Sequence, residues 1–222
     1  QSIGISIIDA VSDTLIKTLN TARQPSAIES SPDGKKMYVL NALGCDISVV
    51  DTTTDTITAT IGVGSVPRAM DITPDGNKLF VGNGNSSTVS VIDTTSSVSL
   101  PESVTSILTL SNMPGKTVFS ADSTKAYAAA PYGGTNVFVM NAATDTLSIN
   151  ITVGTTPTGI AITPDSTKVY VSNAGSRTVS VINTSTDTVV ATIAVGSTPR
   201  GMIMSSDGSK LYVINYGANT VS

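Results

Sequence analysis

The chain has 222 residues, a formal net charge of −4 and a pI of about 4.6, and only 13% of its residues are charged. With no basic stripe to neutralise phosphates, the sequence argues against a nucleic-acid partner. We expect no membrane span, because no run of 18 apolar residues occurs. The one cysteine, Cys45, cannot form an internal disulfide.

Two predicted strands, Ile5–Asp9 and Thr14–Leu19, open the chain, and the rest repeats around a recurrent turn. The turn reads Pro32-Asp33-Gly34 in its first copy, where Pro presets φ, Asp bonds the backbone ahead and Gly accepts a positive φ. Spacings of 42, 47, 43 and 42 residues separate the turn aspartates, which are Asp33, Asp75, Asp122, Asp165 and Asp207. A fixed period of this length predicts a repeat architecture.

One period contains four predicted strands. Within residues 157–195 they are 158–163, 169–173, 178–182 and 188–193, separated by polar turns. Four short antiparallel strands per period predict the blade of an all-β propeller. No segment of ten residues shows a 3.6-residue period, so we expect almost no helix.

The period predicts one propeller domain over residues 1–222. Its four internal blades are expected at about 20–61, 62–108, 109–151 and 152–193. A fifth blade would combine 194–222, which matches strands one and two, with 1–19, which matches strands three and four. This closure would protect the sheet edges of a monomer, but self-assembly by strand exchange with a neighbouring molecule stays open.

The first strand of each blade is predicted to lie nearest the propeller axis. Small residues fill one aligned column of these strands, at Ala27, Ala69, Gly159 and Gly201. The third blade is irregular, because Lys116 occupies this column and an insertion runs through 97–114.

In three of the repeats, the predicted second strand carries a related pattern. The segments are Tyr38-Val39-Leu40-Asn41, Tyr170-Val171-Ser172-Asn173 and Tyr212-Val213-Ile214-Asn215. This pattern resembles the Tyr-Val-Thr-Asn signature of YVTN β-propeller repeats, particularly those of archaeal surface-layer and related cell-surface proteins. The resemblance covers nearly the whole chain and implies a surface location with an adhesive or structural role. Such propellers usually have seven blades, whereas the repeats here number five.

Few residues suited to catalysis are present. Without His, a Ser-His-Asp triad and a histidine base are excluded, and Cys45 has no basic neighbour in the sequence. Asp51 and Asp55 lie four apart in a Thr-rich turn, but the further carboxylates of a calcium loop are missing, so we interpret them as turn residues. We therefore expect no enzyme activity, catalytic residue, metal or cofactor.

Five charged residues are predicted to lie on one face of the ring, near the inner strands. They are Arg68, Lys116, Arg200, Glu29 and Asp71. The cations would suit a carboxylate or an acidic glycan, and the two carboxylates a glycosidase. We prefer simple pairing between these charges and a polar channel mouth.

Three Asn-x-Ser/Thr sequons are candidate glycosylation sites on a surface protein. Asn85 and Asn183 are predicted in loops, and Asn150 in an outermost strand.

Two hypotheses for function stay open. The first is a non-enzymatic extracellular or cell-surface module for adhesion, envelope assembly or protein–protein interaction, with protein or glycan partners at the cell envelope. The second is a lectin-like or weakly hydrolytic propeller that uses the ring face.

Overall fold

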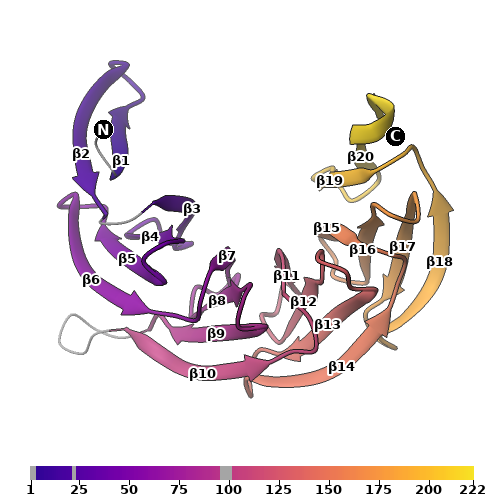
Figure 1. The fold of residues 1–222 in the computed structure, drawn as a ribbon. Helices are drawn as coiled ribbons and strands as arrows, with labels where there is room; N and C mark the ends of the chain where they lie inside the picture. Colours follow the sequence, from indigo (N-terminus) through magenta and orange to yellow (C-terminus); the bar gives the residue numbers. More distant parts are fainter. Residues whose placement is uncertain (1–3, 22–23, 96–101) are drawn as a thin grey trace. The chain divides into compact units, whose positions relative to one another are not determined.

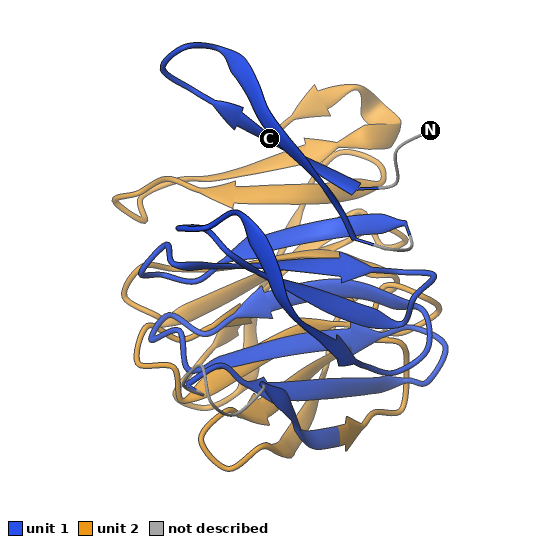
Figure 2. Cartoon of the chain, turned by 90° about the vertical axis from the view of Figure 1, so that its left-hand side faces the viewer, with its two compact units in different colours: residues 1–107 blue, residues 108–222 orange. Residues whose placement is uncertain are grey.

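The computed structural model describes residues 4–21, 24–95 and 102–222. The chain divides into two compact units, residues 1–107 and residues 108–222, here called the N-terminal and the C-terminal unit (Figure 2). Strands make up nearly all of the regular structure, and within the described ranges the only helix is the short 3-10 helix η1 (Tyr216–Ala218). The expectation of almost no helix is confirmed.

The N-terminal unit contains a hairpin followed by two antiparallel sheets of four strands (Figure 1). The hairpin pairs β1 (Gly4–Asp9) with β2 (Thr14–Asn20). The first sheet consists of β3 (Pro25–Ser30), β4 (Lys36–Asn41), β5 (Asp46–Asp51) and β6 (Thr56–Gly62). The second consists of β7 (Pro67–Ile72), β8 (Lys78–Asn83), β9 (Thr88–Asp93) and β10 (Ser103–Thr109), whose last residues cross the unit boundary.

The C-terminal unit repeats this plan with two sheets of four strands and one of three. One sheet consists of β11 (Thr117–Phe119), β12 (Lys125–Ala129), β13 (Asn136–Asn141) and β14 (Thr146–Thr152). The next consists of β15 (Pro157–Ile162), β16 (Lys168–Asn173), β17 (Thr178–Asn183) and β18 (Thr188–Ala194). The last consists of β19 (Pro199–Met204), β20 (Leu211–Asn215) and β21 (Thr220–Val221). The predicted repeat of four antiparallel strands is confirmed.

Neighbouring sheets within each unit pack face to face through apolar side chains. In the N-terminal unit, Tyr38 and Leu40 of one sheet are buried with Met70 and Val81 of the next. In the C-terminal unit, β12, β13 and β14 contribute to an equivalent cluster with β15, β16 and β17. In each unit, two neighbouring four-stranded sheets therefore bury apolar faces against each other.

The hairpin β1–β2 covers one face of the sheet β3–β6, where Leu19 is buried with Val39 and Val50. Hydrogen bonding keeps the terminal strands in two separate sheets, β1–β2 and β19–β20–β21. In the second of these sheets, β21 pairs with β20. If the ring were closed by the N-terminus, an N-terminal strand would pair with β20 at that position. The blade shared by both termini therefore stays a prediction, as does the number of blades. Residues 97–101 of the predicted insertion lie outside the described residues.

The Asn that ends the second strand ties it to the third strand. The Nδ2 of Asn83 donates to Thr88 Oγ1 at 3.1 Å and to Ser90 Oγ at 2.9 Å. Asn173 makes the same pair of bonds, to Thr178 and Ser180. A Cβ on Gly64 would lie 2.6 Å from Asn83 Cγ, so only glycine permits the approach of this loop to the Asn side chain.

The turn between the first and second strands is organised by its aspartate. Asp207 Oδ1 accepts hydrogen bonds from Ser205 Oγ at 2.6 Å and from the Ser209 N–H at 3.0 Å. The Asp51 carboxylate caps its own turn in a similar way, accepting from the N–H groups of Thr53 and Thr54, as the sequence analysis expected. These donors favour the ionised carboxylates.

The inner strands β15 and β19 approach each other closely. Thr158 Oγ1 donates to Pro199 O at 2.9 Å, and Ser172 Oγ donates to Arg200 O at 2.7 Å. A Cβ on Gly159 would lie 2.0 Å from Arg200 O, whereas a Cβ on Gly201 would meet nothing nearer than Ile214 Cδ1 at 3.4 Å. The small residue is thus a steric requirement at Gly159 and not at Gly201.

We predict that Gly159→Ala lowers the free energy of unfolding by about 1–3 kcal/mol, because the added methyl group must push β15 and β19 apart. Gly201→Ala, in the same aligned column, should change it by less than about 0.5 kcal/mol. Urea denaturation of the two variants checks this, and equal losses of stability would contradict it.

We also predict a loss of stability in acid. The Ser or Thr hydroxyl that donates to the turn carboxylate lowers the pKa of Asp33, Asp122, Asp165 and Asp207, the last to about 2. Because a carboxylate with a lowered folded pKa stabilises the fold above its unfolded pKa, this contribution disappears as the pH falls from about 4 toward 2. Denaturation at pH 6, 4, 3 and 2 should show it, and an unchanged free energy of unfolding down to pH 2 would refute it.

Candidate functional site

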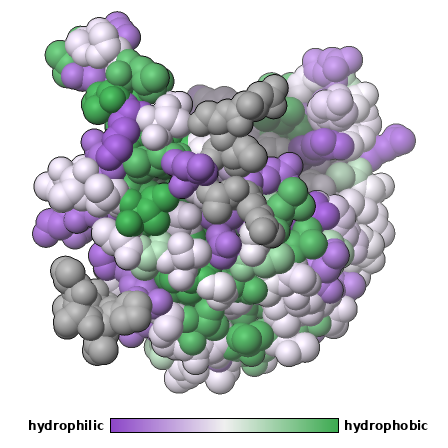
Figure 3. All heavy atoms as spheres, turned by 60° about the vertical axis from the view of Figure 1, so that its left-hand side comes forward, coloured by the Kyte–Doolittle hydropathy of each residue, from purple (hydrophilic) through white to green (hydrophobic). Residues whose placement is uncertain are grey.

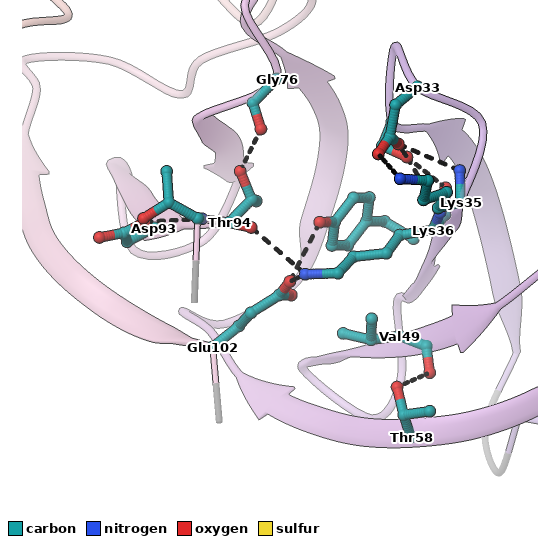
Figure 4. Close-up of polar contacts among 12 residues, drawn as sticks. Asp33, Lys35, Lys36, Val49, Thr58, Gly76, Asp93, Thr94 and Glu102 are labelled. Atoms are coloured by element: carbon teal, nitrogen blue, oxygen red, sulfur yellow. Dashed lines mark hydrogen bonds and ion pairs between the residues drawn. The ribbon is translucent and has the colours of Figure 1, made fainter. Parts of the chain in front are cut away.

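A lysine, a tyrosine and a carboxylate join the two complete sheets of the N-terminal unit. The ammonium of Lys36 pairs with the Glu102 carboxylate, and it also donates to Thr94 O at 3.3 Å. The Tyr38 hydroxyl donates to Glu102 Oε1 at 3.2 Å. Figure 4 shows the Lys36 and Glu102 side chains directed toward each other between the two sheets.

The C-terminal unit repeats this arrangement. Lys125 Nζ lies 2.8 Å from Asp187 Oδ2 and donates to Thr184 O at 2.7 Å. The Tyr127 hydroxyl donates to Asp187 Oδ1 at 2.7 Å. We call each of these two arrangements a lysine–tyrosine–acid contact.

Both lysine–tyrosine–acid contacts include a buried tyrosine. Tyr38 and Tyr127 are fully buried, and their burial, together with the neighbouring carboxylate, raises the pKa of both phenols above the ordinary value. Both hydroxyls therefore stay protonated and donate a hydrogen bond at physiological pH. Each carboxylate accepts from a lysine and a buried tyrosine of the neighbouring sheet, so we interpret both contacts as part of the sheet packing.

The C-terminal unit contains a cavity of about 630 Å³ beside its inner strands. The residues around it come from β15, β19 and the loops that precede or follow strands. It is lined by Lys116, Pro131, Tyr132, Thr156, Thr158, Gly159, Ile160, Ala174, Thr198, Arg200, Gly201 and Met202.

Two cations and no carboxylate line this cavity, so its lining is positively charged. Lys116 lies directly before β11, and Arg200 is the second residue of β19. The Arg200 guanidinium lies over the Tyr216 ring, 4.4 Å from its centroid, which restrains the side chain. The main chain of β19 is fixed by the bonds from Thr158 and Ser172. Arg200 is thus held on a rigid strand at the cavity, the arrangement that a binding residue needs.

The structure places the five predicted ring-face residues in different units. Lys116 and Arg200 line one cavity in the C-terminal unit. Glu29 and Asp71 are the fifth residues of β3 and β7, neighbouring inner strands of the N-terminal unit, and Arg68 is an exposed residue of β7. A ligand-binding role for any of them stays a prediction.

Of the candidate glycosylation sites, Asn85 lies exposed in the turn between β8 and β9, and Asn150 lies exposed in the fourth strand β14. Asn183 is the last residue of β17 and not a loop residue as predicted. Its side-chain oxygen accepts from the N–H and hydroxyl groups of Ser185, because an Asx turn forms there. A glycan attaches to the side-chain nitrogen, which these bonds do not use, so Asn183 stays a candidate site.

Sequence reasoning missed several residues of the cavity. Tyr132 and the Thr hydroxyls at 156, 158 and 198 belong to connections whose spatial proximity no spacing reveals. Tyr216 follows β20 in the short helix η1, at the aligned position that Ala174 holds after β16. The sequence did offer one signal for the Thr residues of the cavity. A Thr-Pro doublet recurs at 156–157 and 198–199, and its Pro begins an inner strand in both places.

Within 4–21, 24–95 and 102–222, no three His, Cys, Asp or Glu side chains come together as metal ligands would. None of the helices described has the length and apolar character that crossing a membrane requires.

A family described as "Lactonase, 7-bladed beta-propeller" matches residues 7–111, which is less than half of the chain and ends before the cavity residues. No curated protein sequence matches.

Solved structures resemble this fold along most or all of the chain. A functionally unknown protein from Desulfotomaculum acetoxidans has a TM-score of 0.80 at 16% identity, covering 100% of this chain and 75% of its own. The Cps50 (Swd1) β-propeller domain from Myceliophteria thermophila has a TM-score of 0.71 at 10% identity, covering 87% and 62%. Kuenenia stuttgartiensis hydrazine synthase has a TM-score of 0.60 at 19% identity, covering 99% and 88%.

These comparisons identify the fold. The chain is a β-propeller. Identities below 20% carry no activity from these structures to this chain, and the family match covers less than half of it.

Proposed function

We propose that this propeller is a non-catalytic binding module of the cell surface that holds a carboxylate-bearing ligand, an acidic glycan or a related acid, in the cavity beside β15 and β19. The observation that carries the proposal is a cavity of about 630 Å³ lined by Lys116 and Arg200 and by no carboxylate. A volume of this size lies within the usual range of ligand pockets.

The chemistry of the lining suits this ligand class. A guanidinium presents a planar set of donors that matches a carboxylate, and stacking on Tyr216 reduces the entropy lost when Arg200 binds. Lys116 adds a second positive charge on a flexible stem. The Thr156, Thr158 and Thr198 side chains offer hydroxyl groups of the kind that hydrogen-bond to sugar hydroxyls.

The surface location and adhesive role rest on the sequence. The Tyr-Val-x-Asn strands resemble YVTN repeats of cell-surface propellers, and Ser and Thr are abundant where Lys and Glu are scarce. Glycosylation at the exposed Asn85 and Asn150 would agree with this location.

Lactone hydrolysis is the second candidate, favoured by the family match to residues 7–111. That match falls on the N-terminal part of the chain, whereas the cavity is lined by residues from 116 to 202. A spectrophotometric assay with simple aliphatic and aryl lactones separates the candidates, because the binding module should show no turnover above the uncatalysed rate.

We predict that oligosaccharides with uronic or sialic acid residues bind the protein and that their neutral counterparts do not. Arg200→Ala and Lys116→Ala should each weaken binding at least about tenfold, because each removes one positive charge at the carboxylate. Isothermal titration calorimetry on a ligand chosen from a glycan array measures this.

Arg177→Ala is the matched control, since Arg177 is an exposed arginine of the same unit in the turn between β16 and β17, outside the cavity lining. Its affinity should equal that of the unchanged protein. Absence of binding to every acidic ligand, or equal losses for Arg177→Ala and Arg200→Ala, would count against the proposal.

A further inference from the structure

A groove of about 360 Å³ lies in the C-terminal unit, between the complete sheets β11–β14 and β15–β18. Its residues come from the end of β14 and the loop after it, from the turn before β17, and from β17 and β18. They are Thr152, Val153, Gly154, Ser176, Thr178, Ser180, Val189 and Thr192, and none of these lines the cavity that holds Arg200. We call this second hollow the hydroxyl groove.

One face of β17 and β18 lines the hydroxyl groove, and it is turned toward the sheet β11–β14. Ser180 and Thr192 are cross-strand partners, so their side chains share this face, and Thr178 shares it two residues along β17. Ile182 lies on the same face, where it is buried in one apolar cluster with Tyr127 of β12. Along this face, hydroxyl side chains therefore follow the aliphatic ones that pack the two sheets together.

Asn173 holds two of the hydroxyls in place. Its Nδ2 donates to Thr178 Oγ1 at 3.1 Å and to Ser180 Oγ at 2.9 Å, and its side chain is buried beside Gly154. A hydroxyl that accepts a hydrogen bond keeps its own proton to donate. In the described part of the chain neither hydroxyl donates to another residue, so both are positioned donors without an acceptor.

The other three hydroxyl residues of the groove are exposed. They are Thr152, Ser176 and Thr192, and Ser176 Oγ accepts the N–H of Thr155 at 2.8 Å. Across residues 4–21, 24–95 and 102–222, the Thr152 and Thr192 hydroxyls form no hydrogen bond with another residue. Both are therefore available to donate to a ligand and to accept from it.

The second complete sheet of the N-terminal unit has the same support but a different lining. Asn83 makes the same pair of bonds there as Asn173 makes in the sheet β15–β18. In the aligned repeat, Gly62 holds the position of Thr152, and Ile107 holds that of Thr192. The bonds of the Asn thus belong to the repeat, whereas the Thr152 and Thr192 hydroxyls are not required by it.

The lining of the hydroxyl groove suits a neutral sugar. None of its described residues is charged, so an ion would lose its hydration there without gaining a partner. Its five hydroxyls match the donors and acceptors of sugar hydroxyls, and Val153 and Val189 offer apolar contact to the C–H groups of a sugar ring. An extended peptide fits less well, because β17 is already paired along both of its edges.

We propose that the hydroxyl groove binds one neutral sugar unit, independently of the acid-binding cavity. A volume of about 360 Å³ lies near the lower end of the usual range of ligand pockets, which favours a single ring. Figure 3 shows pale residues, the colour of intermediate hydropathy that Ser and Thr have, over much of the surface in that view. Hydroxyl content alone therefore marks no site, and the evidence here is the hollow with positioned donors at Thr178 and Ser180.

The test titrates the isotope-labelled full chain with the methyl glycosides of glucose, galactose, mannose and N-acetylglucosamine, followed by NMR of the main-chain amides. At least one glycoside should bind with a millimolar dissociation constant and shift the amide signals of Gly154, Ser176 and Thr192. Thr152→Val with Thr192→Val keeps the side-chain shape and removes two hydroxyls. This double variant should bind at least about fivefold more weakly, because two hydrogen bonds to the sugar are lost.

Thr188→Val is the matched control, since Thr188 is an exposed threonine of the same strand β18 outside the groove lining. It should bind the glycoside as the unchanged protein does. Arg200→Ala should also leave this affinity unchanged, and the Thr152 and Thr192 double variant should keep its affinity for acidic oligosaccharides. Either binding site can then fail without the other.

Three results would overturn the proposal. The first is no change in the amide signals of the groove with any of the four glycosides at tens of millimolar. The second is an equal loss of affinity in Thr188→Val and in the double variant. The third is binding of an uncharged peptide, acetyl-glycylglycine amide, in the groove while the glycosides do not bind, which would make this a peptide site.

Discussion

A four-stranded sheet with two apolar faces can be stable in water only when both faces are covered. This constraint explains the packing within each unit, because the sheet that carries Tyr38 or Tyr127 buries its apolar face on that of the next complete sheet. The lysine–tyrosine–acid contact accompanies this packing at its edge. It pairs the charges of Lys125 and Asp187 and satisfies the buried Tyr127 hydroxyl, so the sheets dock in one register.

The close packing of the sheets also determines where the cavity lies. Close approach of β15 and β19 requires glycine at 159, and the bonds from Thr158 and Ser172 fix the main chain on either side of Arg200. A rigid strand then carries the cation to the cavity, and η1 supplies the Tyr216 ring that restrains it. The candidate site thus follows from the packing of inner strands and from an aromatic residue in the repeated loop after β20.

Much of the fold could be predicted from the sequence, because its signals are local. The Pro-Asp-Gly turns, the alternating strands and the small residue at Gly159 each act within a few residues or recur at a fixed period. The lysine–tyrosine–acid contacts could not be predicted, since Lys36 and Glu102 lie 66 residues apart and meet only when two sheets stack. The cavity was predicted in part: Lys116 and Arg200 were identified by alignment, while Tyr132 lies in a loop that departs from the repeat.

The most direct test of this account is a double-mutant cycle on Lys125 and Asp187, measured by urea denaturation. Lys125→Met, Asp187→Ala and the double variant give the coupling energy between the two side chains. If these contacts hold neighbouring sheets in register, the coupling should be about 1–3 kcal/mol and favourable. Additive effects of the two substitutions, with a coupling energy near zero, would contradict the account.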